Sequence, residues 1–144
     1  MRKDIKDMVN EKDMCVLATV SGGKPHCSLM SYVADDECSE IYMVTQKKTS
    51  KYKNMIENPH LSLLIDDREE NTAALRQSSK ALTISGTFQA IDNMNKKKSA
   101  ADRLIKRHPY LNVFIDDPET EIFCVKIVSF LLLDGLTNAY FEEV

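Results

Sequence analysis

The chain has 144 residues, of which 43% are hydrophobic and 28% charged, so we expect one globular domain, residues 1–144, with a single core. The formal net charge of −3 argues against nucleic acid as a partner, because broad nucleic-acid binding requires a basic surface. The charged first residues lack the apolar segment of a signal peptide, and no apolar run is long enough to span a bilayer. We therefore expect a cytoplasmic protein without membrane contact.

The first third of the chain predicts a helix followed by strands. Residues 2–12 carry apolar side chains at helical spacing, and residues 14–20 form a β-branched run typical of a strand. The Gly-rich turn at 21–24 joins this run to a second strand that begins at Pro25, which predicts a β-hairpin. A further strand at 41–45 extends the hairpin to a three-stranded meander.

The next helix begins at Thr49 or Ser50, because either hydroxyl can cap its first turn. It ends before Pro59, since proline disfavours helical backbone in the residue that precedes it. A later strand contains Gly86, where we expect a bend or a bulge. The remaining elements are a strand at 60–67, a loop at 67–79 and the strand with Gly86 at 80–92. A helix at 93–109 and two final strands at 121–144 follow.

These elements predict the fold class. Strands that follow one another through hairpins, without repeated β-α-β units, form a largely antiparallel sheet. The number of strands favours a small barrel, because closure removes exposed strand edges. We therefore expect a mainly β (α+β) protein, a six- to seven-stranded antiparallel split β-barrel with flanking helices.

One segment, Tyr42–Lys53, joins a strand end, a polar turn and a helix start, and it gathers lysines and hydroxyls in an acidic chain. A helix N-terminus offers unpaired N–H groups and the positive end of the helix dipole, which suit a phosphate. Thr49 and Ser50 can donate to phosphate oxygens, and Lys51 can neutralise their charge. The alternative is a solvated first turn with a hydroxyl cap. Cations there oppose the dipole at ~0.3–1 kcal/mol each, and a bound anion reverses that cost.

Taken in order, several segments resemble the pyridoxamine-phosphate-oxidase-like FMN-binding split barrels. They resemble the first hairpin, the third strand, the Ser-Arg-Lys segment, the helix-Asn-Pro-strand segment, the fifth strand and the final strands of that family. The small size is similar to the general-stress-protein branch. The matching segments are Leu17–Val20 with Gly23–His26, Ile41–Thr45, Thr49–Lys51, Asn58–Leu64, Gly86 and Leu132–Gly135.

The resemblance implies a homodimer of split barrels with two FMN sites at the subunit interface. By position, Thr49, Ser50 and Lys51 would hold the phosphate. Val44 and Thr45 would lie near the isoalloxazine ring or the ribityl chain. The second strand would line the flavin through backbone and side chains, with Ser28, Leu29 and Met30.

The chain departs from the family pattern at Ser50, which occupies the usual arginine position. A serine cannot form the bidentate, permanently charged fork of an arginine. Another cation of the same segment would have to compensate, and the candidates are Lys47, Lys48 and Lys53.

The resemblance implies an FMN-dependent oxidoreductase acting on an unidentified small molecule, because flavin supplies the redox chemistry and few catalytic side chains are required. The alternatives are a non-catalytic flavin-binding or stress-response module and a haem-binding split-barrel relative. Neither His26 nor His60 stands out as a haem ligand, and we expect His108 to complement a helix dipole. Family members that oxidise vitamin B6 phosphates have a longer basic C-terminal segment, whereas residues 141–144 are acidic, so we do not expect that activity.

Overall fold

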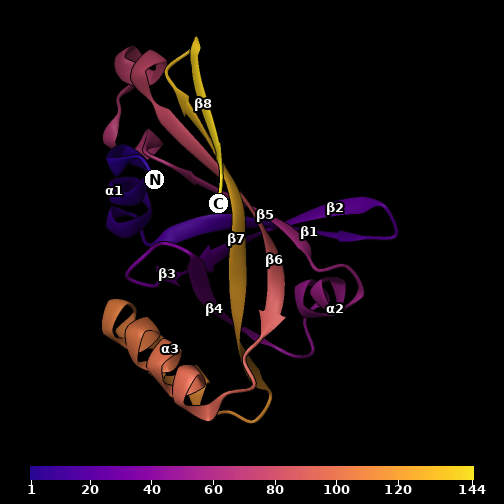
Figure 1. Ribbon diagram of the computed structural model, residues 1–144. Coiled ribbons are helices and arrows are strands. Elements are labelled where there is room, and N and C mark those ends of the chain that lie inside the picture. Colours follow the sequence, from indigo (N-terminus) through magenta and orange to yellow (C-terminus); the bar gives the residue numbers. More distant parts are fainter.

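The computed structural model describes residues 1–144 as one eight-stranded sheet with helices around it (Figure 1). The helices are α1 (Lys3–Glu11), α2 (Ser50–Glu57), α3 (Met94–Arg107) and α4 (Asn112–Ile115), with short 3-10 helices η1 (Arg68–Glu70), η2 (Ala73–Ser78) and η3 (Pro109–Leu111). The strands are β1 (Met14–Ser21), β2 (Lys24–Ser31), β3 (Val33–Ala34), β4 (Glu40–Gln46), β5 (His60–Asp66), β6 (Lys80–Ala90), β7 (Thr120–Asp134) and β8 (Asn138–Glu143). None of the helices has the length and the hydropathy that a membrane crossing requires.

The sheet is an antiparallel split barrel, which confirms the predicted fold class. Its strand order is β2-β1-β5-β6-β7-β4-β3, and β8 pairs with β7 outside this path. Every pairing is antiparallel. The long strand β7 crosses the whole molecule, with β8 against its upper part and β4 beside its lower part (Figure 1).

The predicted three-stranded meander is wrong in its third strand. β1 and β2 form the expected hairpin, but β4 pairs along its full length with β7 and not with β2. The chain leaves β2 at Tyr32, whose N–H donates to the carbonyl of Asp13 at 3.0 Å and whose hydroxyl donates to the carbonyl of Val9 at 2.7 Å. These bonds direct the chain away from β2 before β4 begins. Strands that are consecutive in the sequence often pair, but not always.

Local signals in the sequence predict the cap at Thr49 and the bulge at Gly86 correctly, and the cap of α3 is equally local. Thr49 is the N-cap of α2, and Asn93 caps α3 by accepting from the N–H groups of Asn95 at 2.9 Å and Lys96 at 3.0 Å. The strand register shifts at Gly86, which is the expected bulge. Side chains that hydrogen-bond the first turn of a helix act locally, so the sequence alone is enough to place them.

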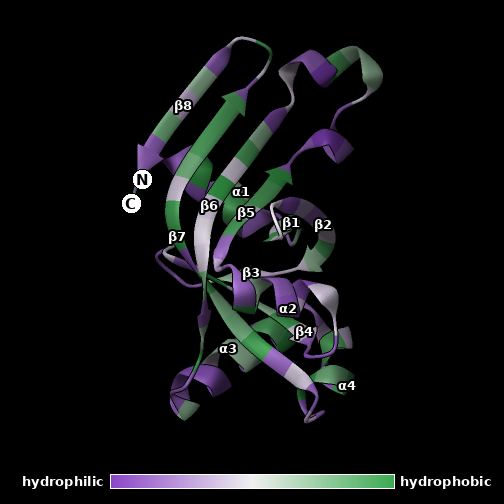
Figure 2. Cartoon of the chain, turned by 90° about the vertical axis from the view of Figure 1, so that its right-hand side faces the viewer, coloured by the Kyte–Doolittle hydropathy of each residue, from purple (hydrophilic) through white to green (hydrophobic).

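The core has two parts. The larger lies inside the barrel and beneath α1, where Tyr32, Phe123 and Phe130 are among the largest fully buried side chains. β5 and β7 are hydrophobic along much of their length in Figure 2. The smaller part attaches α3 and η3 to β4 and β7. Its members are Tyr42, Ile91, Ala100, Leu104, Leu111, Ile122 and Cys124.

Candidate functional site

The turn between β4 and α2 has a fixed hydrogen-bond pattern centred on Thr49. Its hydroxyl donates to the carbonyl of Gln46 at 2.8 Å and accepts from the N–H of Tyr52 at 3.3 Å. It lies 3.2 Å from the hydroxyl of Thr45. Because the proton of Thr49 is used by Gln46, Thr45 is the donor in the threonine pair. Thr49 therefore shapes this turn, and both threonine protons are already bonded within the protein.

The first turn of α2 keeps free donors. The N–H groups of Ser50 and Lys51 make no hydrogen bond within the protein, whereas the N–H groups of Tyr52 and Lys53 bond to Thr49. The first turn holds no acidic residue. Two free N–H groups at the positive end of a helix dipole attract an anion.

The lysines of this segment add positive charge. Lys47 lies 3.8 Å from the carboxylate of Glu121, while Lys48, Lys51 and Lys53 take part in no ion pair of the chain. Ser50, at the position where the family usually has arginine, is exposed. The local charge is therefore positive although the chain as a whole is acidic.

A cavity of about 210 Å³ opens beside this turn. Complete sites for small molecules measure about 300–1,000 Å³, so the cavity suits one end of a ligand such as a phosphate-bearing chain. Its lining comes from β4 and the start of α2 and, from later in the chain, from η3, α4 and the start of β7, which pairs with β4. The lining residues are Val44, Thr45, Gln46, Thr49, Lys51, Leu111, Phe114 and Thr120.

Thr120 is the unusual residue of this cavity. It begins β7 opposite Gln46, and only 8% of it is exposed. Its hydroxyl is the one buried side-chain nitrogen or oxygen in residues 1–144 without a hydrogen-bond partner. No sequence pattern marks this residue, because a threonine at a strand start is ordinary and its lack of a partner depends on the fold.

The predicted residues of β2 lie apart from the cavity within one chain. Met30 is buried in the barrel core, so only its backbone can face a ligand. Leu29 is 69% exposed and lines a separate cavity of about 130 Å³ with Met14 and Leu64. Ser28 is partly buried. The opposite directions of Leu29 and Met30 follow from the alternation of side chains along a strand.

The segment η3–α4 connects the two halves of the predicted site. The Tyr110 hydroxyl hydrogen-bonds with the hydroxyl of Ser31 at the end of β2, while Leu111 and Phe114 line the cavity beside α2. This segment was not among the predicted elements. The sequence signal for this segment is the apolar run after Pro109. Because the proline ends α3, this run cannot belong to that helix.

His108 lies at the end of α3, as expected, but its ring is buried. It is 2% exposed, and its Nε2 lies 2.8 Å from the carbonyl of Tyr32. A carbonyl only accepts, so Nε2 carries the proton and Nδ1 faces the Tyr110 hydroxyl at 3.4 Å. Both ring nitrogens have partners inside the protein, which removes His108 as a free ligand for haem iron. His26 and His60 are exposed on β2 and β5.

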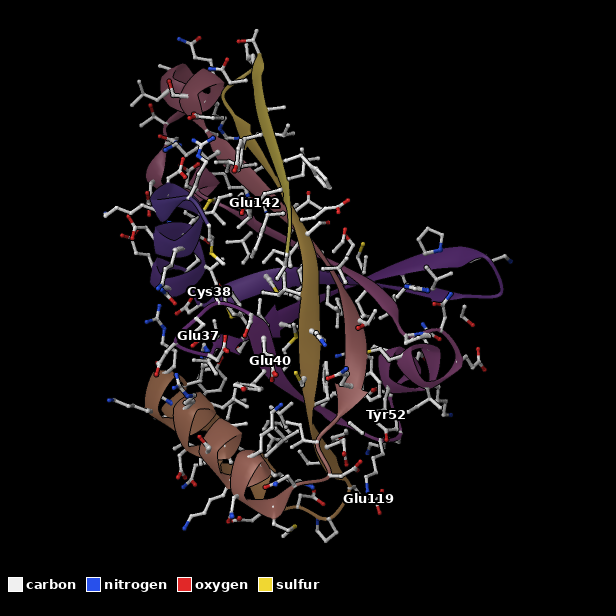
Figure 3. The ribbon with its side chains drawn as sticks, viewed as in Figure 1. Glu37, Cys38, Glu40, Tyr52, Glu119 and Glu142 are labelled. Atoms are coloured by element: carbon white, nitrogen blue, oxygen red, sulfur yellow. The ribbon has the colours of Figure 1, made fainter.

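A half-buried carboxylate attaches α3 to β4 and β7. The Glu40 carboxylate accepts from Lys96 Nζ at 2.8 Å, from Cys124 Sγ at 3.1 Å and from the Tyr42 hydroxyl at 3.2 Å. Figure 3 shows Glu40 between β4 and α3. Burial raises the pKa of Glu40, but the bonds from Lys96 and Cys124 outweigh it and bring the pKa below 4.5. Burial also raises the pKa of the Cys124 thiol to about 12, so this cysteine stays a neutral donor.

Comparison with known proteins extends this description. Residues 1–133 match the family model described as pyridoxamine 5'-phosphate oxidase, and no curated protein sequence matches the chain. General Stress Protein 26 from Bacillus anthracis has 17% identity and a TM-score of 0.72, over 99% of this chain and 97% of that one.

Two further solved structures differ in what their names say they bind. An FAD-binding protein from Mesorhizobium loti has 14% identity and a TM-score of 0.72, over 92% of this chain and 94% of that one. A heme binding protein from Mycobacterium smegmatis has 14% identity and a TM-score of 0.79 over 92% of this chain, which spans only 53% of that protein. At such identities the likeness shows the fold alone.

Proposed function

The chain belongs to the pyridoxamine 5'-phosphate oxidase family, and on that premise we propose that it binds flavin mononucleotide and acts as an FMN-dependent oxidoreductase on a small molecule. The observation that most supports this is the cavity beside α2. Lys51, at a helix start with two free N–H groups, and Thr120, whose buried hydroxyl has no partner, both line it. These groups are donors and a cation, which is the chemistry that a phosphate monoester requires.

We assign the phosphate to the N–H groups of Ser50 and Lys51 and to the Lys51 ammonium. Val44 and Thr45 border the same cavity and are assigned to the part of the cofactor next to the phosphate. FMN ends in a phosphate monoester, whereas FAD continues into a second nucleotide. The donors that line the cavity suit such a terminal phosphate, and we therefore propose FMN and not the FAD named for the Mesorhizobium loti protein.

A second copy of the chain is part of this proposal, because one face of the sheet is apolar and uncovered. The strand register places six residues in one cross-strand row on the face opposite the barrel core. Leu29 and Phe141 at its two ends are 69% and 57% exposed. An exposed apolar row of this length is typical of a protein interface. The row consists of Leu29, Val16, Leu64, Thr83, Leu131 and Phe141.

Within one chain, the predicted residues of β2 lie apart from those of α2. A homodimer would account for this separation, because β2 of one copy could complete the site of the other. The row begins at Leu29, so the second copy would cover the strand that the resemblance assigns to the flavin. We therefore propose that the cofactor sites lie at the dimer interface. When bound, the flavin would supply hydride and electron transfer, and the residues described here would bind and orient it.

Lys51→Ala tests the phosphate assignment. Loss of one charge-assisted hydrogen bond should weaken FMN binding about 10- to 100-fold, measured by quenching of FMN fluorescence. Riboflavin, which has no phosphate, should bind the variant as it binds the wild type. Lys98→Ala is the matched control, because it removes the same charge from an exposed position on α3. Equal FMN affinity in Lys51→Ala and the wild type would refute the assignment.

Turnover separates an enzyme from a flavin-binding module. FMN-loaded protein that oxidises a reduced nicotinamide in the presence of an acceptor would support the oxidoreductase. Protein that binds FMN tightly and oxidises no donor would support the non-catalytic alternative.

A further inference from the structure

Thr120 is conspicuous because its buried hydroxyl has no partner. A polar group that loses water without gaining a hydrogen bond destabilises the folded state. Folded proteins contain few such groups, and each one requires a reason. Since Thr120 lines the cavity beside α2, a ligand in that cavity is a direct candidate for the missing partner.

The backbone at Thr120 is held in place before any ligand arrives. The N–H of Thr120 donates to the carbonyl of Asp117 at 3.0 Å, and the N–H of Lys47 donates to the carbonyl of Glu119 at 2.8 Å. The N–H of Glu119 also donates to the carboxylate of Asp117 at 2.9 Å. This turn therefore attaches the start of β7 to the end of β4. A donor fixed in this way loses little conformational freedom when it binds.

The hydroxyl of Thr120 is also the only threonine donor that the cavity has left. Thr49 donates to Gln46, and Thr45 donates to Thr49. Thr120 pairs with Gln46 of β4, and Lys51 of the first turn of α2 lines the same cavity. An anion in this cavity therefore has both residues as candidate partners.

We propose that Thr120 binds the phosphate of the cofactor by donating a hydrogen bond to a phosphate oxygen. The proposal rests on the assignment of a phosphate monoester to this cavity. It also accounts for part of what the chain loses at Ser50, since the Thr120 hydroxyl would supply one of the donors that an arginine gives. A threonine donor has no charge, so it contributes geometry and selectivity more than electrostatic attraction.

The test compares Thr120→Val, Thr120→Ser and the wild type. Valine keeps the shape and removes the hydroxyl, whereas serine keeps the hydroxyl. We expect Thr120→Val to bind FMN about 10- to 100-fold more weakly and riboflavin as the wild type does. Thr120→Ser should bind FMN within about threefold of the wild type. The ligand-free Thr120→Val protein should melt no lower than the wild type, because it no longer buries an unpartnered hydroxyl.

Inorganic phosphate gives a reading that does not depend on flavin. Millimolar phosphate should raise the melting temperature of the wild type and of Thr120→Ser but not that of Thr120→Val. If the wild type binds phosphate but not FMN, the proposed function fails and the role of Thr120 stands. FMN and phosphate binding that are unchanged in Thr120→Val would overturn the inference and leave a buried water as the partner. An equal loss of riboflavin and FMN affinity would also overturn it.

Discussion

Glu40→Gln is the change that best tests how α3 is attached to β4 and β7. Glutamine has nearly the volume of glutamate but no charge, so the bonds from Lys96, Cys124 and Tyr42 become weaker without leaving a cavity. A hydrogen bond to a charged group contributes about 1.5–3 kcal/mol and a neutral one about 0.5–1.5 kcal/mol. Lys96 is 41% exposed, so solvent screens its share of the interaction. We expect the free energy of unfolding to fall by about 1–2 kcal/mol.

The pH dependence identifies the carboxylate as the cause. The pKa of Glu40 is below its ordinary value of 4.5 in the folded protein, so the folded state favours the charged form. Its contribution to stability is complete above pH 4.5 and disappears as the pH falls through the lowered pKa. The difference between wild type and variant should therefore be largest near neutral pH and vanish in acid.

Urea unfolding of both proteins over this pH range measures the effect. Glu37→Gln is the matched control, because Glu37 is exposed on the neighbouring turn and makes no ion pair or side-chain hydrogen bond there. Equal unfolding midpoints for Glu40→Gln and the wild type at neutral pH would refute the reasoning. A difference that persists unchanged in acid would show that shape, and not charge, is responsible.

Two further predictions concern the sheet. Gly86→Ala should lower the free energy of unfolding by about 1–3 kcal/mol, because its Cβ would lie 2.6 Å from Val125 Cγ1 and 2.7 Å from the carbonyl oxygen of Lys126; an unchanged urea midpoint would contradict this close approach. The wild type should have twice the chain mass in light scattering, and Phe141→Asp should convert it to a monomer that unfolds like the wild-type chain, since Phe141 is exposed in one copy. Met94→Asp, which changes an exposed residue of α3, should remain a dimer, and a monomeric wild type would exclude the proposed interface.

Much of the fold could be predicted from the sequence, because many of its signals are local. Asn93 and Thr49 cap helices through their own side chains, and Gly86 permits a close approach that no other residue would. The partner of β4 could not be predicted, since the pattern of a strand does not identify the strand it pairs with. Tyr32 turns the chain away from β2 through contacts with Val9 and Asp13, which are tertiary.

In the candidate site, too, the local features could be predicted and the tertiary ones could not. Lys51 was predicted because a helix start, a lysine and hydroxyls stand together in the sequence. Leu111, Phe114 and Thr120 complete the cavity from a distant part of the chain, and no motif marks them. The free hydroxyl of Thr120 results from what the fold leaves unpaired, which no pattern of residue types records.

The pairing of β4 with β7 also determines when the cavity can exist during synthesis. Apart from the two residues of β3, the only partner of β4 is β7, which is translated after α2, β5, β6 and α3. Contacts this distant in sequence form late, because a long loop must close before they are made. A ribosome-bound chain that stops before Thr120 has the helix start but lacks both the strand that pairs with β4 and the Thr120 side chain that lines the cavity. Cofactor loading should therefore follow the emergence of β7, and until then the unpaired edge of β4 is open to other chains.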